Sequence, residues 1–223
     1  PYFVPALTDL ASLYYRQGRY DEALARCKTA LSINTYDGDV NYLYGLCNRA
    51  LGNNTDAKDG FSIASYSPGV RSAAYEKLAE MFLIDKNWAK AEHYALKSKE
   101  FNGMNLTADH VLMVVYRKTD RPEKAKALIE SLLEDLPLYH AARFEQLYLG
   151  EGSGHPIDDF QSLIRNELPF ETYMELSEWY ESVGCTEEAL SLLSCAGSYP
   201  VALYKQAYLL HRTGNEDESR QML

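Results

Sequence analysis

The sequence lacks the features that mark membrane spans and the common active sites. It has no apolar run of about 18 residues, so we expect no membrane-spanning helix. It has no HExxH, P-loop, GxSxG or GxGxxG motif, and its five histidines are scattered. Its acidic pairs lie near expected helix starts, where the helix macrodipole favours carboxylates. We therefore expect no enzymatic activity, no metal site and no cofactor.

Basic residues are also fewer than acidic residues. The chain has 22 lysines and arginines against 32 aspartates and glutamates, which gives a formal net charge of −10. Non-specific binding of nucleic acid needs a basic surface that attracts phosphates. The charge balance therefore argues against a nucleic-acid partner.

Cysteine is sparse, and its spacing excludes the usual zinc motifs. Cys27, Cys47, Cys185 and Cys195 form no CxxC pair and no Cys/His cluster. Free thiols are typical of a reducing compartment and favour a cytoplasmic location. A disulfide between Cys27 and Cys47 is the alternative, because their predicted helices are neighbours. Since the first residue is Pro1 and not methionine, we expect the chain to be an excerpt of a longer protein.

The main positive signal is an internal repeat. Alanine recurs at intervals of 34 residues, at Ala23, Ala57, Ala91 and Ala125. Around each alanine a first helix, a glycine or polar turn and a second helix are expected, with small residues where the two helices cross. Seven repeat units are predicted: 4–37, 38–71, 72–105, 106–139, a degenerate 140–169, 170–203, and an incomplete unit at 200–223.

Turn and cap residues agree with this repeat. Gly18, Gly52, Gly184 and Gly214 fall between expected helices, where a glycine commonly ends a helix. The expected N-caps are Asp37, Asn54, Thr107 and Thr186. No segment alternates apolar and polar residues with a period of two, so no sheet is expected. The predicted fold is an all-α, right-handed α-solenoid of about six to seven helical hairpins.

The 34-residue motif resembles the tetratricopeptide repeat superfamily over nearly the whole chain. Three strings carry a narrower resemblance: residues 56–61 (DAKDGF), 140–145 (HAARFE) and 165–173 (RNELPFETY). They resemble uncharacterised Bacteroidetes-type proteins in which a galactose-mutarotase-like domain precedes the repeats. That resemblance implies an upstream domain with a carbohydrate connection, and no catalytic residue in the present chain.

The surface of the first helices is the predicted binding groove for a protein or peptide. Tyrosine and arginine are common binding anchors there, although the repeat itself also requires aromatic residues, and incidental lining is the alternative. Of the positions at which related arrays clamp a terminal carboxylate, only Lys77 fits. The candidate groove residues are Tyr15, Arg16, Tyr42, Arg49, Glu76, Glu80, His110, Arg117, Phe144, Tyr148, Tyr204 and Tyr208.

Two functions remain open from the sequence. The first is a non-catalytic scaffold that binds a peptide or protein in this groove. The second is an accessory module that packs in cis on the upstream domain, in which the glycine-rich segment Gly150–Thr172 would make the contact. A homodimer formed by stacking of the exposed ends of the array is a further expectation.

Overall fold

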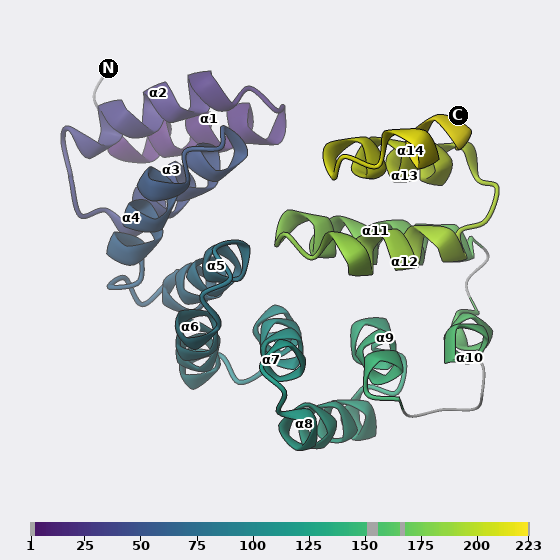
Figure 1. The fold of residues 1–223 in the computed structure, drawn as a ribbon. Helices are drawn as coiled ribbons and strands as arrows, with labels where there is room; N and C mark the ends of the chain where they lie inside the picture. Colours follow the sequence, from purple (N-terminus) through teal and green to yellow (C-terminus); the bar gives the residue numbers. More distant parts are fainter. Residues whose placement is uncertain (1–2, 151–155, 166–167, 223) are drawn as a thin grey trace. The chain divides into compact units, whose positions relative to one another are not determined.

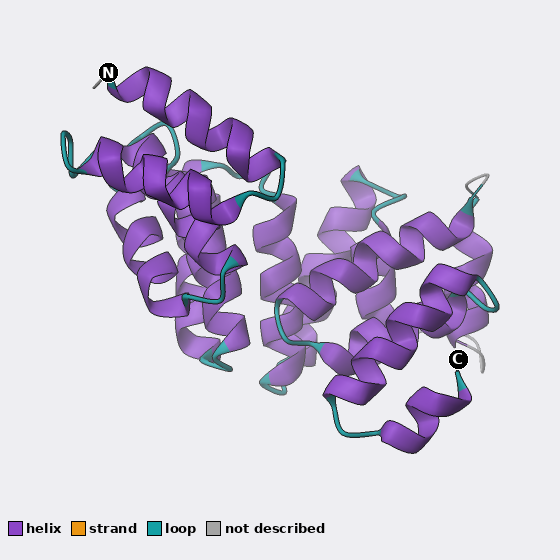
Figure 2. Cartoon of the chain, turned by 90° about the horizontal axis from the view of Figure 1, so that it is seen from above, coloured by secondary structure: helices purple, strands orange, loops and turns teal. Residues whose placement is uncertain are grey.

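The computed structural model describes residues 3–150, 156–165 and 168–222. Over these ranges the chain forms fourteen α-helices joined by short loops, and no strand occurs in them (Figure 2). The all-α solenoid predicted from the repeat is confirmed. No helix in the described ranges is long and apolar enough to span a membrane.

The helices alternate as first and second members of hairpins. Their bounds are α1 Val4–Arg16, α2 Tyr20–Leu31, α3 Gly38–Ala50, α4 Asn54–Ala64, α5 Arg71–Ile84, α6 Trp88–Phe101, α7 Leu106–Lys118, α8 Pro122–Asp135, α9 His140–Tyr148, α10 Pro156–Leu163, α11 Pro169–Ser182, α12 Thr186–Cys195, α13 Pro200–Arg212 and α14 Glu216–Gln221.

The chain divides into two compact units, Pro1–Leu112 (unit 1) and Met113–Leu223 (unit 2). In unit 1 each helix from α1 to α5 packs on the next one along the chain (Figure 1). In unit 2 the hairpins α11–α12 and α13–α14 pack in the same way, and α12 also contacts α13.

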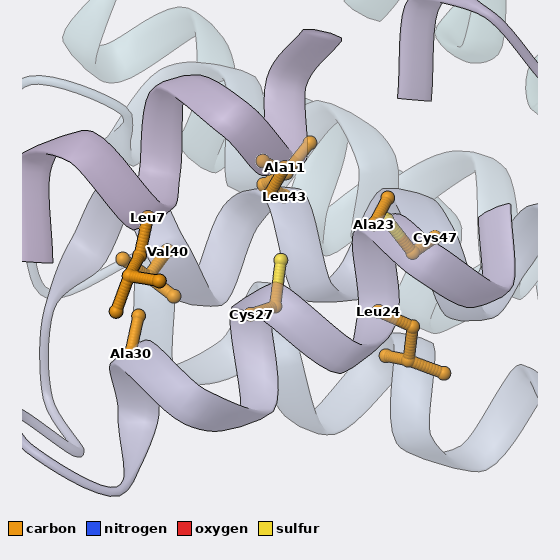
Figure 3. Close-up of a cluster of buried hydrophobic side chains, with 9 residues drawn as sticks. All are labelled: Leu7, Ala11, Ala23, Leu24, Cys27, Ala30, Val40, Leu43 and Cys47. Carbon is orange, nitrogen blue, oxygen red and sulfur yellow. The ribbon is translucent and has the colours of Figure 1, made fainter. Parts of the chain in front are cut away.

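The core of the first hairpins shows why the repeat needs small residues. Ala23, Cys27 and Ala30 of α2 lie against Val40 and Cys47 of α3, and all five side chains are buried (Figure 3). A small side chain lets two helix backbones approach closely while larger neighbours fill the space beside it. The other alanines spaced by 34 residues, Ala57, Ala91 and Ala125, are buried for the same reason.

In the second hairpin two glycines allow α3 and α4 to cross closely. A Cβ atom on Gly60 would lie 2.9 Å from the backbone oxygen of Asn41. A Cβ atom on Gly45 would lie 2.7 Å from the ring of Phe61, which is fully buried. Both contacts are shorter than carbon atoms tolerate, so both positions exclude a side chain.

The predicted glycine caps are confirmed. Gly18, Gly52, Gly184 and Gly214 all have positive φ, a conformation that glycine adopts at little cost.

The N-cap predictions were right at Asp37, whose Oδ1 accepts a hydrogen bond from Val40 N at 3.1 Å. They were wrong by one residue at α4 and α12, where Asn54 and Thr186 are already the first helical residues, and by two residues at α7. Helix α7 starts at Leu106, and Asn105 Oδ1 accepts from Ala108 N at 3.1 Å in place of a cap by Thr107.

The structure decides the alternative of a disulfide between Cys27 and Cys47, and it does not test the predicted contact of the segment Gly150–Thr172. Cys27 and Cys47 lie on neighbouring helices as expected, but they are free buried thiols and not a disulfide. Gly152 and Gly154 of the segment predicted to contact an upstream domain lie outside the described residues, and that contact stays a prediction.

Candidate functional site

In unit 1 the first helices bring five predicted groove residues together. Tyr15 comes from the end of α1, Tyr42 and Arg49 from α3, and Glu76 and Glu80 from α5. Residues at equivalent positions of successive repeats lie on the same surface, which is why three helices supply one cluster. We call these five residues and Lys77 the unit 1 cluster.

Alternating charges hold this cluster together. The guanidinium of Arg49 pairs with Glu80, linking α3 to α5. Lys77 Nζ lies 3.1 Å from Glu80 Oε2 and 2.8 Å from Glu76 Oε1. The second oxygen of Glu76 accepts a hydrogen bond from Asn105 Nδ2 at 2.8 Å. Two cations and two carboxylates therefore balance, and the network ties two consecutive repeats.

The pKa values of the ionic groups follow from this pairing. Burial alone would raise the pKa of Glu80, but Lys77 and Arg49 outweigh it and hold the pKa below its usual value. Burial would lower the pKa of Lys77, but Glu80 and Glu76 raise it above its usual value. Both groups are therefore charged at neutral pH.

The two tyrosines of the cluster are half-buried. The Tyr42 ring packs on Phe61 with centroids 5.7 Å apart, and Tyr15 packs on Tyr20 at 5.5 Å. Burial is the main reason that the pKa values of Tyr15 and Tyr42 are raised. Their hydroxyl groups thus stay protonated and can both donate and accept hydrogen bonds.

A cavity adjoins the unit 1 cluster at Glu76. It has a volume of about 560 Å³ and lies between the loop before α5 and the loop before α7. Glu76 and Asn105 provide polar groups in its wall, and Phe101 and Met104 provide exposed apolar ones.

Unit 2 contains a second network around Arg117 of α7. Its Nε lies 2.7 Å from Glu145 Oε2 and its Nη2 lies 3.0 Å from Glu145 Oε1, a bidentate pair. Its Nη1 lies 2.9 Å from Glu188 Oε1, which Lys118 Nζ approaches to 2.6 Å. Both carboxylates are almost fully buried, so this network belongs to the interior of the unit.

Aromatic rings surround this second network. Tyr180 Oη donates to Glu145 Oε1 at 2.6 Å, and the Arg117 guanidinium lies 4.3 Å from the centroid of Tyr148. Phe144 contacts the rings of Tyr148, Phe160 and Tyr180. Burial raises the pKa of Tyr148 to about 12. Of these rings only Tyr148 is exposed, so it alone of this group offers surface to a partner.

Residues 8–59 match the family model of the tetratricopeptide repeat. The crystal structure of a tetratricopeptide repeat protein from Parabacteroides merdae ATCC 43184 superposes with a TM-score of 0.67 at 17% identity, over 94% of this chain and 85% of that chain. A thermophilic protein of the same repeat type from Thermus thermophilus gives a TM-score of 0.55 at 18% identity, over 93% and 99%. MamA gives 0.57 at 16%, over 86% and 89%.

The chain has the fold of a tetratricopeptide repeat protein. No curated protein matches the sequence. The narrower resemblance to arrays that follow a galactose-mutarotase-like domain is not tested by these likenesses and stays a prediction.

Within this tetratricopeptide fold, three predicted groove residues are buried. Glu80, His110 and Phe144 are 2%, 4% and 0% exposed, so they cannot contact a partner directly. Burial depends on how neighbouring helices pack over a position, which the repeat register alone did not reveal. Arg16 is exposed but lies beside Leu13 in a separate shallow cavity on α1.

The last two predicted groove residues lie on α13. Tyr204 and Tyr208 are 66% and 48% exposed. The Arg212 guanidinium lies 5.5 Å from the Tyr208 ring centroid and 3.0 Å from Glu181 of α11.

Sequence reasoning missed four members of the unit 2 network, which are Glu145, Glu188, Lys118 and Tyr180. Glu188 was explained by its place in the first turn of α12, but it also pairs with Arg117 and Lys118. Tyr180 was not among the predicted groove residues, although its hydroxyl donates a hydrogen bond to Glu145. In each network the arginine pairs with a glutamate on the first helix of the next repeat, 31 residues from Arg49 to Glu80 and 28 residues from Arg117 to Glu145. Opposite charges on successive first helices are the signal that could have found both networks.

The part of the chain that the structure describes contains no group of three or more His, Cys, Asp or Glu side chains able to hold a metal ion. The buried carboxylates of Glu80, Glu145 and Glu188 are paired with cations and, at Glu145, a tyrosine. These ion pairs join helices of different repeats, so they stabilise the packing of the solenoid.

Because of the ion pairs in the unit 1 cluster, we expect the free energy of unfolding to fall in acid. The folded-state pKa of Glu80 lies below the unfolded value of about 4.3, so the unfolded chain binds more protons near that pH. The stabilisation is complete above that unfolded value and disappears as pH falls through the lower, folded-state pKa. Urea unfolding of wild type and Glu80→Gln should differ most at neutral pH and converge in strong acid. Glu130→Gln, at an exposed position, is the control, and an equal difference at both pH values would contradict the assignment.

Proposed function

We propose that the chain is a non-catalytic scaffold that binds an extended peptide or protein segment on the first-helix surface of unit 1. Tetratricopeptide repeats generally mediate protein–protein interaction. The observation that carries the proposal is the convergence of Tyr15 and Tyr42 with the paired charges of Arg49, Lys77 and Glu76 on three successive first helices.

Several features of the unit 1 cluster support this function. The tyrosines are held in place by Phe61 and Tyr20, so little conformational entropy is lost when they contact a partner. The charged side chains are fixed by one another before any partner arrives. A rigid surface with flat rings and polar tips is what binding hot spots need.

The cavity beside Glu76 indicates what the partner offers. Its wall combines the carboxylate of Glu76 with exposed Phe101 and Met104. A long side chain with an apolar stem and a cationic end, lysine or arginine, fits this combination. The acidic composition of the chain favours such a partner as well.

The test is selection of peptides from a displayed random library against the full chain, followed by titration of the selected peptides. Tyr15→Ala and Tyr42→Phe should each weaken binding, by about 10-fold when combined, or about 1.4 kcal/mol. The matched controls are Tyr36→Ala and Tyr66→Ala, since both tyrosines are 81% exposed on loops between hairpins. Selected peptides that bind all four variants equally would place the binding surface elsewhere and refute the proposal.

A further inference from the structure

The cavity beside Glu76 is formed where two successive first helices of unit 1 begin. Ser72 and Ala73 belong to the first turn of α5, and Leu106 and Thr107 belong to the first turn of α7. Among the described residues that line this cavity, Glu76 alone is ionisable. The charge that a ligand meets in the cavity wall is therefore negative.

A chain of hydrogen bonds fixes the carboxylate of Glu76 in this wall. Asn105 Nδ2 donates to Glu76 Oε2 at 2.8 Å and to Ser98 Oγ at 2.9 Å, and Ser98 Oγ donates to the backbone oxygen of Ser72 at 2.8 Å. Ser98 and Asn105 are 0% and 8% exposed, so these bonds are shielded from water. The side chain of Glu76 is 15% exposed, so its carboxylate is held in one orientation and still faces the cavity.

We propose that this cavity selects a lysine side chain of the bound segment in its charged form. Glu76 is then the specificity-determining residue, and Asn105 is the residue that positions its carboxylate. This specificity rests on the function proposed above and narrows it from a cationic side chain to lysine. Acetylation of that lysine removes the charge that pairs with Glu76, so the acetylated segment should bind less tightly.

Two features of the cavity wall favour lysine over arginine. The ring of Phe101, on which a guanidinium would stack, already has the guanidinium of Arg71 at 4.7 Å from its centroid. Each oxygen of Glu76 already contacts one donor, so the bidentate pairing of an arginine competes with both. A lysine ammonium needs one acceptor position, and its flexible stem can pack on the exposed side chain of Met104.

The probe for a test is the tightest-binding peptide selected against the full chain, synthesised with each of its lysines replaced in turn. At one lysine, Nε-acetyl-lysine and norleucine should each weaken binding at least about 10-fold, because Glu76 loses a charged hydrogen-bond partner. Arginine at the same place should weaken binding about 3-fold. Fluorescence polarisation of the labelled peptides measures each affinity.

Glu76→Gln assigns this discrimination to the cavity. The variant should bind the lysine and norleucine peptides within about 2-fold of each other, because an amide has no charge to pair with the ammonium. Glu100→Gln is the matched control, since the side chain of Glu100 is 57% exposed and does not line the cavity. It should discriminate between the two peptides as the wild type does.

Asn105→Ser tests the positioning role. Serine can still cap α7, but it lacks the amide that holds Glu76. The preference for the lysine peptide over the acetyl-lysine peptide should fall at least about 3-fold. Both affinities are measured below the thermal unfolding midpoint of the variant, and their ratio does not respond to a loss of stability alone.

The outcomes distinguish lysine selection from peptide binding itself. Selected peptides that depend on Tyr15 and Tyr42 but bind equally well without any of their lysines would overturn the lysine specificity and leave the scaffold function standing. Wild-type discrimination by Glu76→Gln would also overturn it, because the lysine would then pair elsewhere. If no selected peptide depends on Tyr15 and Tyr42, both proposals are wrong.

Discussion

Replacing Arg117 with alanine should lower the free energy of unfolding by about 3–5 kcal/mol. This arginine serves two carboxylates, Glu145 and Glu188, that are each 1% exposed. Without the guanidinium, Glu145 keeps only the hydroxyl of Tyr180 among its contacts described here, and Glu188 keeps Lys118. Water cannot replace the lost partner at such depth, so a buried charge is left uncompensated.

Urea unfolding followed by circular dichroism measures this effect. Arg212→Ala is the matched control, because Arg212 of α13 also pairs with a glutamate of another helix, Glu181 of α11, but its side chain is 55% exposed. This substitution should lower the free energy of unfolding by less than about 1 kcal/mol. Arg117→Lys should also be costly, since an ammonium group cannot reproduce the bidentate pair. Equal, small effects of Arg117→Ala and Arg212→Ala would show that the network contributes little.

Phe144→Ala should lower the free energy of unfolding by about 3–5 kcal/mol, although the repeat register placed this residue in the binding groove. Phe144 is fully buried and its ring contacts Phe160, Tyr180 and Tyr148. Alanine removes the ring and leaves a cavity among side chains that cannot close it.

The control for this change is Tyr204→Ala, at a predicted groove residue that is 66% exposed. It should change stability by less than about 0.5 kcal/mol. Phe144→Leu, which keeps most of the volume, should fall between the two. If Phe144→Ala left the thermal unfolding midpoint unchanged, Phe144 would not be a core residue.

The predicted helices follow from features that act within one repeat. Ala23 and Ala57 mark helix crossings because only a small side chain fits there, and Gly18 and Gly52 mark turns because they adopt positive φ. Helix starts were predicted less accurately: at α4 and α12 the expected caps, Asn54 and Thr186, proved to be the first helical residues. A cap can shift by one residue without changing the packing of the helix.

The candidate site was predictable only as a set of positions. The repeat register identified Tyr15, Tyr42, Arg49 and Glu76 as residues of first helices, and the structure brings them together. It did not distinguish Tyr148, which is exposed, from Phe144, which is buried on the same helix. That distinction depends on α10 and α11, because Phe160 and Tyr180 cover one side of α9.

The sequence by itself determined the helical repeat, the places where its helices cross and turn, and the lack of recognisable catalytic motifs, because each of these depends on residues close together in the chain. Only the tertiary structure decided which charged residues pair and which predicted contact residues are buried. Arg49 and Glu80, and Arg117 and Glu145, come from different repeats. Their pairing depends on the distance between packed helices, which no local pattern specifies.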